Sequence, residues 1–352
     1  MNTIIEKELE FLVLGDAQTR GRAALVPLLR PEPANGPEYL MLSEALQQGL
    51  LRVTEVSEGG AVPELKVTNE AGFPVLILDG EELAGAKQNR VVNTTILLRE
   101  KSETVIPVSC TERGRWAYRS PVFHDSEAVM ARDARGKKSR SVHESLKRSG
   151  FHRSDQGEVW AEVDRLHEHL RVCSPTAAMR DAYEARRDTL STWAGAFPLL
   201  DGQTGLVFLL DGKPAGLEFL SHPRAYRLAH DRLIKSYTID LDPDEPAKPA
   251  VRASAGDPAG ELAAPDSAAR AAAAAFRASL AALSENVYPS CGYGDDHRFE
   301  SESICGSVLV HQDACVHAAF FQDTAAAEHH RPGPRMASYQ ERLRHRRQRG
   351  DS

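Results

Sequence analysis

The chain has 352 residues, of which 41% are hydrophobic and 26% are charged, and its formal net charge is −7. This composition is that of a folded globular protein rather than a disordered chain. The negative charge argues against nucleic acid as a partner, because neutralising phosphates needs a positive contact face. Five scattered cysteines without a Cys-x-x-Cys pair predict free thiols rather than a zinc or dithiol site.

The first residues, MNTIIEKELEFLVLG, carry Glu6, Glu8 and Glu10 where a secretory signal has basic residues. No run of about 18 apolar residues, the length that spans a bilayer, occurs in the sequence. We therefore expect a cytoplasmic protein without a membrane partner.

Short apolar runs typical of strands fill the sequence from Phe11 to about Val108. They are FLVL, ALVPLL, LLRVTEV, ELKVTN, PVLIL, VVNTTILL and ETVIPVS. SEALQQG (43–49) instead predicts a helix, with Ser43 as N-cap and Gly49 as the stop. From about residue 127 to 196 the periodicity becomes helical, with an apolar stripe at Val159, Val163, Leu166 and Leu170.

Residues 205–220 predict a hairpin that turns at Asp211-Gly212, followed by a helix from 221 to about 236. An alanine-rich helix over 268–284 and strands over about 303–311 and 315–321 complete the pattern. The segment 242–268, rich in Pro, Ala and Asp, predicts a flexible insertion.

The predicted fold class is α+β. We expect a β-rich part over residues 1–122, a helical middle over 123–200, a mixed hairpin-plus-helix part over 201–321, and a disordered basic tail over 322–352.

Charge is distributed unevenly between two segments. Residues 55–82 hold seven acids against one lysine, whereas residues 132–153 hold eight lysines and arginines against two acids. Either these segments face each other, or each of them contacts a ligand.

The densest polar chemistry lies in LILDGEELAGAKQNRVVNTTILL (76–98), between two apolar runs. A turn at Asp79-Gly80 explains only the first of these polar residues. Burying the others costs several kcal/mol unless each finds a partner or a ligand. An internal salt-bridge network and a polar ligand pocket both satisfy this condition.

Three arginines follow in VSCTERGRWAYRS (108–120). On an extended chain Arg113, Arg115 and Arg119 share one side, with Trp116 and Tyr118 opposite. Guanidinium groups bind phosphate or carboxylate, and aromatic rings stack on bases. The alternative is that the arginines pair with the acids of residues 55–82.

Cys110 and the motif RSDQGEVW (153–160) complete the candidate residues. A buried structural role for Cys110 is favoured over a nucleophilic one, because four residues separate it from Arg115, whereas phosphatase loops have five. Asp155 and Glu158 fit a helix capping box. Arg153 and Gln156 are not explained by capping, and a helix N-terminus attracts anions.

The sequence resembles the ADP-ribosylglycohydrolase-, rhodanese- and phosphatase-associated protein domain family (ARG and Rhodanese-Phosphatase-superfamily-associated protein domain) over roughly residues 9–321. The resemblance rests on VPELKVTNEAGFPVLILDGEELAGAKQNRVVNTTILL, IPVSCTERGRW, RSDQGEVW, the segment from DGKPAGLEF to LIKSY, and GSVLVHQDACVHAAFF. It implies a connection with ADP-ribose or NAD-derived metabolites, and it implies no catalytic residues.

We therefore predict a polar pocket, built from residues 79–90, 110–119 and 153–156, that binds or processes a phosphorylated, nucleotide-like small molecule. An enzyme of this kind would be a hydrolase or group transferase, with Glu81 or Glu82 as general acid/base and Cys110 as a less favoured catalytic group. The predicted ligand-binding residues are Asp79, Lys87, Gln88, Asn89, Arg90, Arg113, Arg115, Arg119, Arg153, Asp155 and Gln156.

No metal site is expected, and neither a cofactor nor an oligomeric state is indicated. The alternative to an enzyme is a noncatalytic ligand-sensing or partner-binding module.

Overall fold

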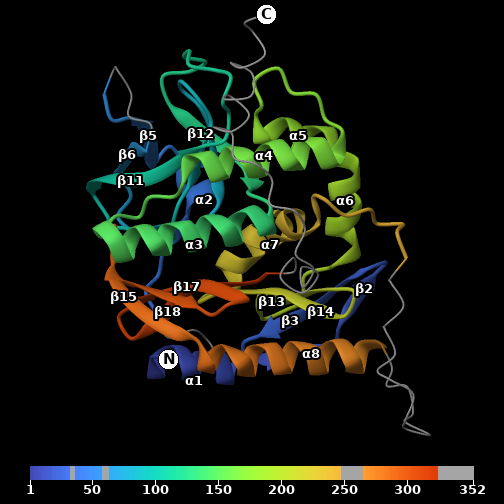
Figure 1. The fold of residues 1–352 in the computed structure, drawn as a ribbon. Helices are drawn as coiled ribbons and strands as arrows, with labels where there is room; N and C mark the ends of the chain where they lie inside the picture. Colours follow the sequence, from blue (N-terminus) through green and yellow to red (C-terminus); the bar gives the residue numbers. More distant parts are fainter. Residues whose placement is uncertain (32–35, 58–62, 247–264, 324–352) are drawn as a thin grey trace, which may run out of the picture.

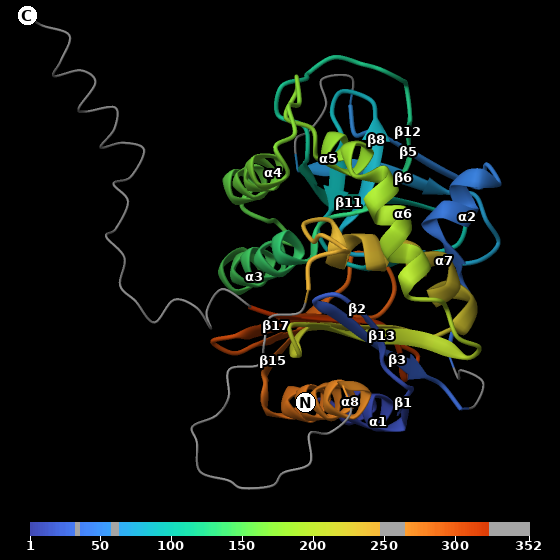
Figure 2. The same cartoon turned by 90° about the vertical axis from the view of Figure 1, so that its right-hand side faces the viewer.

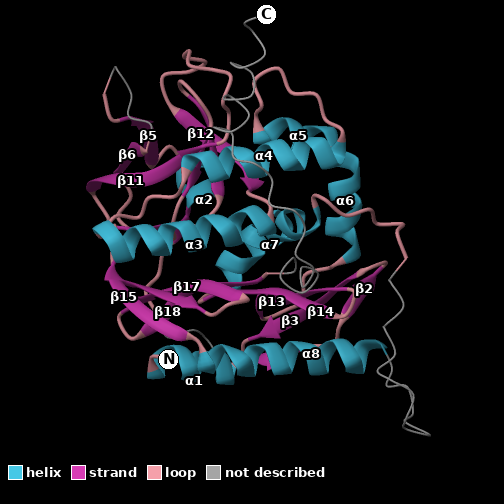
Figure 3. Cartoon of the chain, viewed as in Figure 1, coloured by secondary structure: helices cyan, strands magenta, loops and turns pink. Residues whose placement is uncertain are grey.

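The computed structural model describes residues 1–31, 36–57, 63–246 and 265–323, and it forms two β-assemblies with helices between and around them (Figure 1). Most of the predicted insertion and nearly all of the predicted tail lie outside these residues. The α+β prediction is confirmed, as Figure 3 shows by its mixture of helices and strands.

The first assembly is an antiparallel sheet with the strand order β1-β3-β13-β14-β18-β17-β16-β15, in which β2 also pairs with β3. Its N-terminal strands are β1 (Val13–Leu14), β2 (Gln18–Arg20) and β3 (Ala23–Leu29). Its other strands are β13 (Gln203–Leu210), β14 (Lys213–Leu220), β15 (Ser284–Pro289), β16 (Asp295–Glu300), β17 (Ile304–His311) and β18 (Ala314–Gln322). Strand β3 pairs directly with β13, so the whole of residues 30–202 lies between two neighbouring strands.

The second assembly is a closed antiparallel barrel with the order β11-β6-β5-β12-β8-β9. Its strands are β5 (Leu51–Glu55), β6 (Glu64–Asn69), β8 (Glu81–Gly85), β9 (Arg90–Val92), β11 (Ser102–Cys110) and β12 (Phe123–Val129). A small sheet of β4 (Leu40–Met41), β7 (Val75–Ile77) and β10 (Ile96–Leu98) lies beside it, together with α2 (Leu42–Gln47). Apolar side chains from these strands, such as Val53, Leu83 and Ile106, fill one core.

Helices α1 (Thr3–Phe11) and α8 (Pro265–Ser279) cover the lower face of the large sheet (Figure 2). Helix α1 buries Ile5 and Leu9, which are four residues apart and therefore share one face. Helices α3 (Arg132–Ser149) and α7 (Pro223–Thr238) lie between the sheet and the barrel, with α6 (Arg187–Ala196) beside α7. Helices α4 (Gln156–Leu170) and α5 (Met179–Ala185) pack outside the barrel, where they share a core with Val91 and Ala128.

Most predicted elements are present. The helix predicted at 43–49 is α2, although its N-cap is Met41 and the predicted cap, Ser43, lies inside the helix. The apolar stripe from Val159 to Leu170 belongs to α4, and the predicted hairpin is β13–β14, which turns at Asp211-Gly212 with both φ angles positive. The alanine-rich helix ends at Ser279, earlier than predicted, because a 3-10 turn (Leu280–Ala282) leads directly into β15. Helix α1 and strands β8, β12, β15 and β16 were not predicted.

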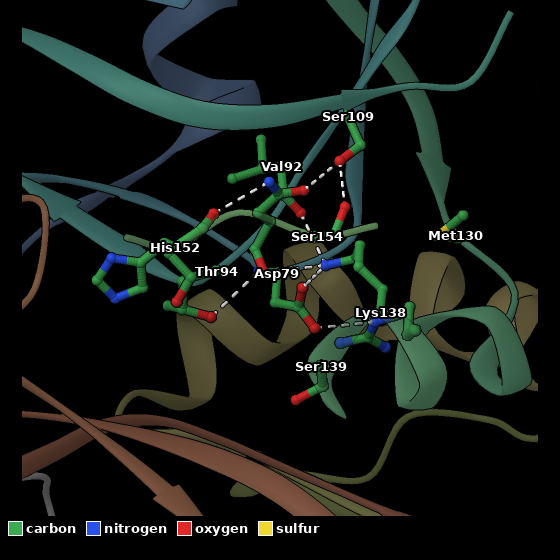
Figure 4. Close-up of polar contacts among 12 residues, drawn as sticks. Asp79, Val92, Thr94, Ser109, Met130, Lys138, Ser139, His152 and Ser154 are labelled. Carbon is green, nitrogen blue, oxygen red and sulfur yellow. Dashed lines mark hydrogen bonds and ion pairs between the residues drawn. The ribbon is translucent and has the colours of Figure 1, made fainter. Parts of the chain in front are cut away.

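Helix α3 connects the two assemblies through buried ion pairs. The Lys138 ammonium contacts the Asp79 carboxylate in the turn before β8, and it donates hydrogen bonds to the carbonyls of Val92 (3.0 Å) and Asn93 (3.1 Å) (Figure 4). One turn earlier, Arg135 donates to both carboxylate oxygens of Glu218 on β14, at 2.7 and 3.0 Å. The acidic and basic segments of the sequence therefore face each other here.

The side chains of both pairs are buried. Burial favours the neutral form of Glu218, but the charge of Arg135 and its two hydrogen bonds outweigh burial and lower the pKa of Glu218 to about 2. Gly80 is required beside them, because a Cβ at its φ of +87° would lie 2.7 Å from Nε of Arg135. The junction thus combines charge pairing with close packing.

We expect Asp79→Ala to lower the free energy of unfolding by about 3–5 kcal/mol, because it leaves the Lys138 ammonium buried without its counterion. Urea denaturation measures this change. The matched control is Glu103→Ala, which breaks the half-exposed ion pair with Lys66 (3.5 Å) and should change stability by less than about 1 kcal/mol. Equal effects of the two substitutions would contradict a structural role for the junction.

Candidate functional site

Strand β8 carries the two predicted acids, and both are fully buried. Glu81 accepts a hydrogen bond from the backbone N–H of Leu78 (2.8 Å), and its Oε1 lies 3.6 Å from Arg232 of α7. Burial raises the pKa of Glu81 to about 7, although the charge of Arg232 opposes the rise. Glu81 therefore already has a cation and a backbone partner inside the protein.

Glu82 has a different environment. Side chains alternate along a strand, so Glu82 shares the outer face of the barrel with Ala84, whereas Leu83 packs in the apolar core. Its Oε1 accepts a hydrogen bond from Thr111 Oγ1 (2.6 Å). Burial raises the pKa of Glu82 to about 7, against this hydrogen bond and the positive charge of Arg180 on α5. Glu82 is thus a carboxyl group that exchanges its proton near neutral pH.

The loop between β8 and β9 holds its polar residues in internal contacts. The Arg90 guanidinium donates to Gln88 Oε1 (3.2 Å) and lies 3.9 Å from Glu55 Oε1. The Lys87 ammonium lies 5.5 Å from the ring centroid of Trp116 and 5.1 Å from that of Tyr118, within the range of cation–π contacts.

Arg115 is the centre of a second network. It donates to the carbonyls of Ala86 (2.7 Å) and Ala117 (2.8 Å), to Asn89 Oδ1 (3.2 Å) and to Glu112 Oε2 (2.6 Å). The salt-bridge network that the sequence left open is therefore present for these residues.

The expectation that three arginines share one side of an extended chain is wrong. Residues 111–119 form no strand, Arg115 is buried, and Arg113 is exposed and pairs with Asp164 of α4 (3.1 Å). Arg119 is also exposed, and within the described residues its guanidinium makes neither an ion pair nor a hydrogen bond. The inward turn of Arg115 explains the separation, because the buried carbonyls of the β8–β9 loop need its donors.

A cleft of about 470 Å³ lies between β8, the segment around Arg119 and the start of α5. Its lining residues are Ala84, Gly85, Asn89, Glu112, Arg119, Ser120, His124, Pro175, Thr176, Ala178, Arg180, Asp181 and Glu184. Burial lowers the pKa of His124, and the positive charge of Arg180 lowers it further, so the imidazole is neutral at pH 7. Gly85 allows the chain to pass closely here, since at its φ of +126° a Cβ would lie 2.6 Å from Ser120 Oγ.

Cys110 and the motif at 153–156 do not line this cleft. Cys110 is buried, and burial raises the pKa of its thiol, the opposite of what activates a nucleophile. The Gln156 amide accepts from Cys110 N (2.7 Å) and donates to Cys110 O (2.9 Å), which fixes α4 against β11. Asp155 caps α4 by accepting from two backbone N–H groups, but the predicted capping box is incomplete, because the Asp155 N–H donates to Ser141 instead of Glu158. Arg153 lies exposed near Glu64 (3.8 Å).

Sequence reasoning missed the contribution of α5 and the turn before it. Arg180 and Glu184 are four residues apart and form an ion pair of 2.7 Å at the cleft, while Ala178 and Ala182 face the core. The sequence does contain a signal for this helix: Ala178, Ala182 and Ala185 have the spacing of one helical face, and charged residues occupy the opposite face.

Among the described residues, no group of three or more His, Cys, Asp or Glu side chains is arranged to hold a metal ion. In the same part of the chain, no helix combines the length and the apolarity that crossing a membrane requires.

The architecture is that of an α+β protein in which a barrel and a large antiparallel sheet enclose a charged junction. The profile of the ARG and Rhodanese-Phosphatase-superfamily-associated Protein domain matches residues 11–321. The chain belongs to this family, which confirms the resemblance seen in the sequence. Searches of curated proteins and of solved structures gave no match to the chain.

The pKa of Glu82 predicts a pH-dependent stability. Its pKa is about 7 in the folded protein and 4.5 when unperturbed, so the folded state binds the proton more tightly and loses stability as the pH rises through this window. Glu82→Gln removes that loss. Thermal melts on both sides of the window should show the variant gaining melting temperature relative to the wild type as the pH rises.

Glu112→Gln is the control with the opposite sign. Burial raises the pKa of Glu112, but its bonds to Arg115 and Thr176 outweigh burial and lower it below 4.5. The carboxylate therefore stabilises the fold above this pH, and Glu112→Gln should lower the melting temperature most at neutral pH. Parallel profiles of melting temperature against pH for Glu82→Gln and the wild type would contradict a pKa of about 7 for Glu82.

Proposed function

We propose that the cleft binds a phosphorylated, nucleotide-like small molecule, such as an ADP-ribose or NAD derivative. The observation that carries the proposal is the exposed Arg119 guanidinium, which has no counterion among the described residues and lines the cleft, as a second arginine, Arg180, also does. Guanidinium groups bind phosphate oxygens with two parallel hydrogen bonds. The volume of about 470 Å³ is within the range of small-molecule sites.

Two aromatic side chains support a nucleotide-like ligand. Trp116 and Tyr118, just before Arg119, are 49% and 53% exposed. Large exposed aromatic rings offer faces on which a base can stack. The Lys87 ammonium, within cation–π distance of both rings, adds positive charge to this segment. The family description, which names ARG, is in keeping with an ADP-ribose-related ligand.

We further propose Glu82 as the general acid/base of a hydrolysis or group transfer. A pKa of about 7 suits a group that both donates and accepts a proton at neutral pH. Glu82 is preferred to Glu81, which is engaged by Arg232 and by the backbone of Leu78.

The five cysteines are unpaired, which fits a reducing, cytoplasmic location.

A noncatalytic ligand-sensing module is the second candidate. The observation that favours it is the complete burial of Glu82, whose carboxyl group bonds to Thr111 and is not part of the cleft lining. Catalysis would require the ligand or a water molecule to reach this carboxyl group.

Arg119→Ala should weaken the binding of ADP-ribose by about tenfold or more, because a hydrogen bond to a charged group contributes about 1.5–3 kcal/mol. Isothermal titration calorimetry with ADP-ribose and NAD measures the change. Arg227→Ala removes an exposed arginine of α7 that does not line the cleft, and it should leave the affinity unchanged. If the wild type binds neither compound, or if both variants bind alike, the proposed ligand site is incorrect.

Glu82→Gln separates the enzyme from the sensor. For an enzyme, the rate at which ADP-ribose or NAD is consumed should fall by about 100-fold while affinity is retained, because general acid/base catalysis commonly contributes this much. Chromatography of the reaction products measures the rate, and calorimetry measures the affinity. A wild type that binds the compound and leaves it intact would identify a sensor.

A further inference from the structure

Cys291, His152 and Asp296 form a linear arrangement outside the cleft described above. Cys291 lies in the turn between β15 and β16, His152 follows the C-terminal end of α3, and Asp296 is on β16. Cys291 Sγ is 3.6 Å from Nδ1 of His152, and Nε2 of the same imidazole is 2.9 Å from Oδ2 of Asp296. Among the described residues, none of the other four cysteines forms a hydrogen bond with a histidine.

The partners of the imidazole determine its tautomer. The Asp296 carboxylate also accepts hydrogen bonds from Arg298 Nε (2.9 Å) and Nη2 (2.8 Å) and from Thr94 Oγ1 (3.1 Å). Burial would raise the pKa of Asp296, but the charge of Arg298 and the bond to His152 hold it well below its usual range. An ionised carboxylate only accepts, so Nε2 carries the proton and the lone pair of Nδ1 faces the thiol.

A hollow gives access to this sulfur. It measures about 280 Å³, and both Cys291 and His152 line it. Two of its other lining residues, Val105 and Phe151, are large apolar side chains that are 47% and 58% exposed, with Tyr288 beside them. Figure 4 shows the His152 ring near Thr94, to one side of the network around Asp79 and Lys138. The lining favours an apolar group next to the thiol.

We propose that Cys291 and His152 form a nucleophile–base pair, oriented by Asp296, that takes an acyl group with an apolar chain from an activated ester or thioester. The thiol sulfur forms a bond to the carbonyl carbon while its proton passes to Nδ1 of His152. The carbon–oxygen or carbon–sulfur bond to the leaving group breaks, and the leaving group takes that proton. Water then hydrolyses the thioester on Cys291, which releases a carboxylic acid and restores the thiol.

The resting thiol keeps its proton. Burial, reinforced by the negative charge of Asp296, raises the pKa of the Cys291 thiol to about 12. The imidazole therefore takes the proton during the attack instead of before it, as a general base does for a hydroxyl nucleophile. The charge on Asp296 stabilises the imidazolium that forms in this step.

The test uses the full chain with Cys173→Ser, which removes the one fully exposed thiol. p-Nitrophenyl acetate and p-nitrophenyl butyrate serve as probes. The release of nitrophenolate measures the acylation rate, and peptide mass spectrometry identifies the acylated residue. We expect one acyl adduct, on Cys291, faster acylation by the butyrate, and no adduct in Cys291→Ser. His152→Gln should slow acylation by about 100-fold, the usual contribution of a positioned base.

Asp296→Asn tests the positioning residue. It should lower the limiting acylation rate without raising the ester concentration that half-saturates it, because Asp296 contacts the imidazole and not the ester. Cys315→Ala removes a buried thiol without a histidine partner and is the control that should leave the rate unchanged. Circular dichroism shows which variants fold. If His152→Gln does not fold, His152→Asn is used in its place.

The proposal is overturned if the esters leave Cys291 unmodified. It is equally overturned if acylation of Cys291 proceeds at the same rate in the folded His152 variant as in its parent. Neither result bears on ADP-ribose binding, which concerns the other cleft.

Discussion

The contact of Lys138 with Asp79, backed by the fork of Arg135 on Glu218, is the interaction on which the rest of the structure depends. Desolvating four ionised groups is unfavourable unless their charges compensate one another at short range. Their compensation fixes α3 at one distance from both the barrel and the large sheet. Because Asp79 begins the turn into β8, the same pairs also fix the strand that carries Glu82 and Ala84, and with it one wall of the cleft.

Burial and pairing divide the polar residues of this region into two kinds. The first kind is held in internal hydrogen bonds: Arg90 donates to Gln88, and Arg115 donates to the Ala86 carbonyl and to Asn89, so these residues maintain the fold. Glu82 and Arg119 differ, since one is a carboxyl group with a pKa near 7 and the other is a guanidinium facing solvent. Groups whose charge is not matched by the fold are the ones available for a ligand.

The sequence predicted the amphipathic and hairpin elements well because their signals are local, as in the stripe of α4 and the Asp211-Gly212 turn. Strand β8 was missed because its five residues are all buried and two are acids, which hides the usual alternation. The density of polar groups pointed to the segments 79–90 and 110–119, but of the predicted ligand-binding residues only Asn89 and Arg119 line the cleft. Which arginine turns inward, and which helix completes the cleft, depends on packing between segments distant in sequence, as for Ala86 with Arg115 and Ala84 with α5.

The pairing of β3 with β13 has a consequence for biosynthesis. Leu29 lies opposite Gln203, so the apolar strand ALVPLL emerges from the ribosome long before the strand that covers its edge. The barrel can close in the meantime, since all six of its strands lie between Leu51 and Val129. The nascent chain therefore exposes an unpaired, apolar strand edge during much of translation. At this stage, binding by chaperones or association with other chains competes with folding.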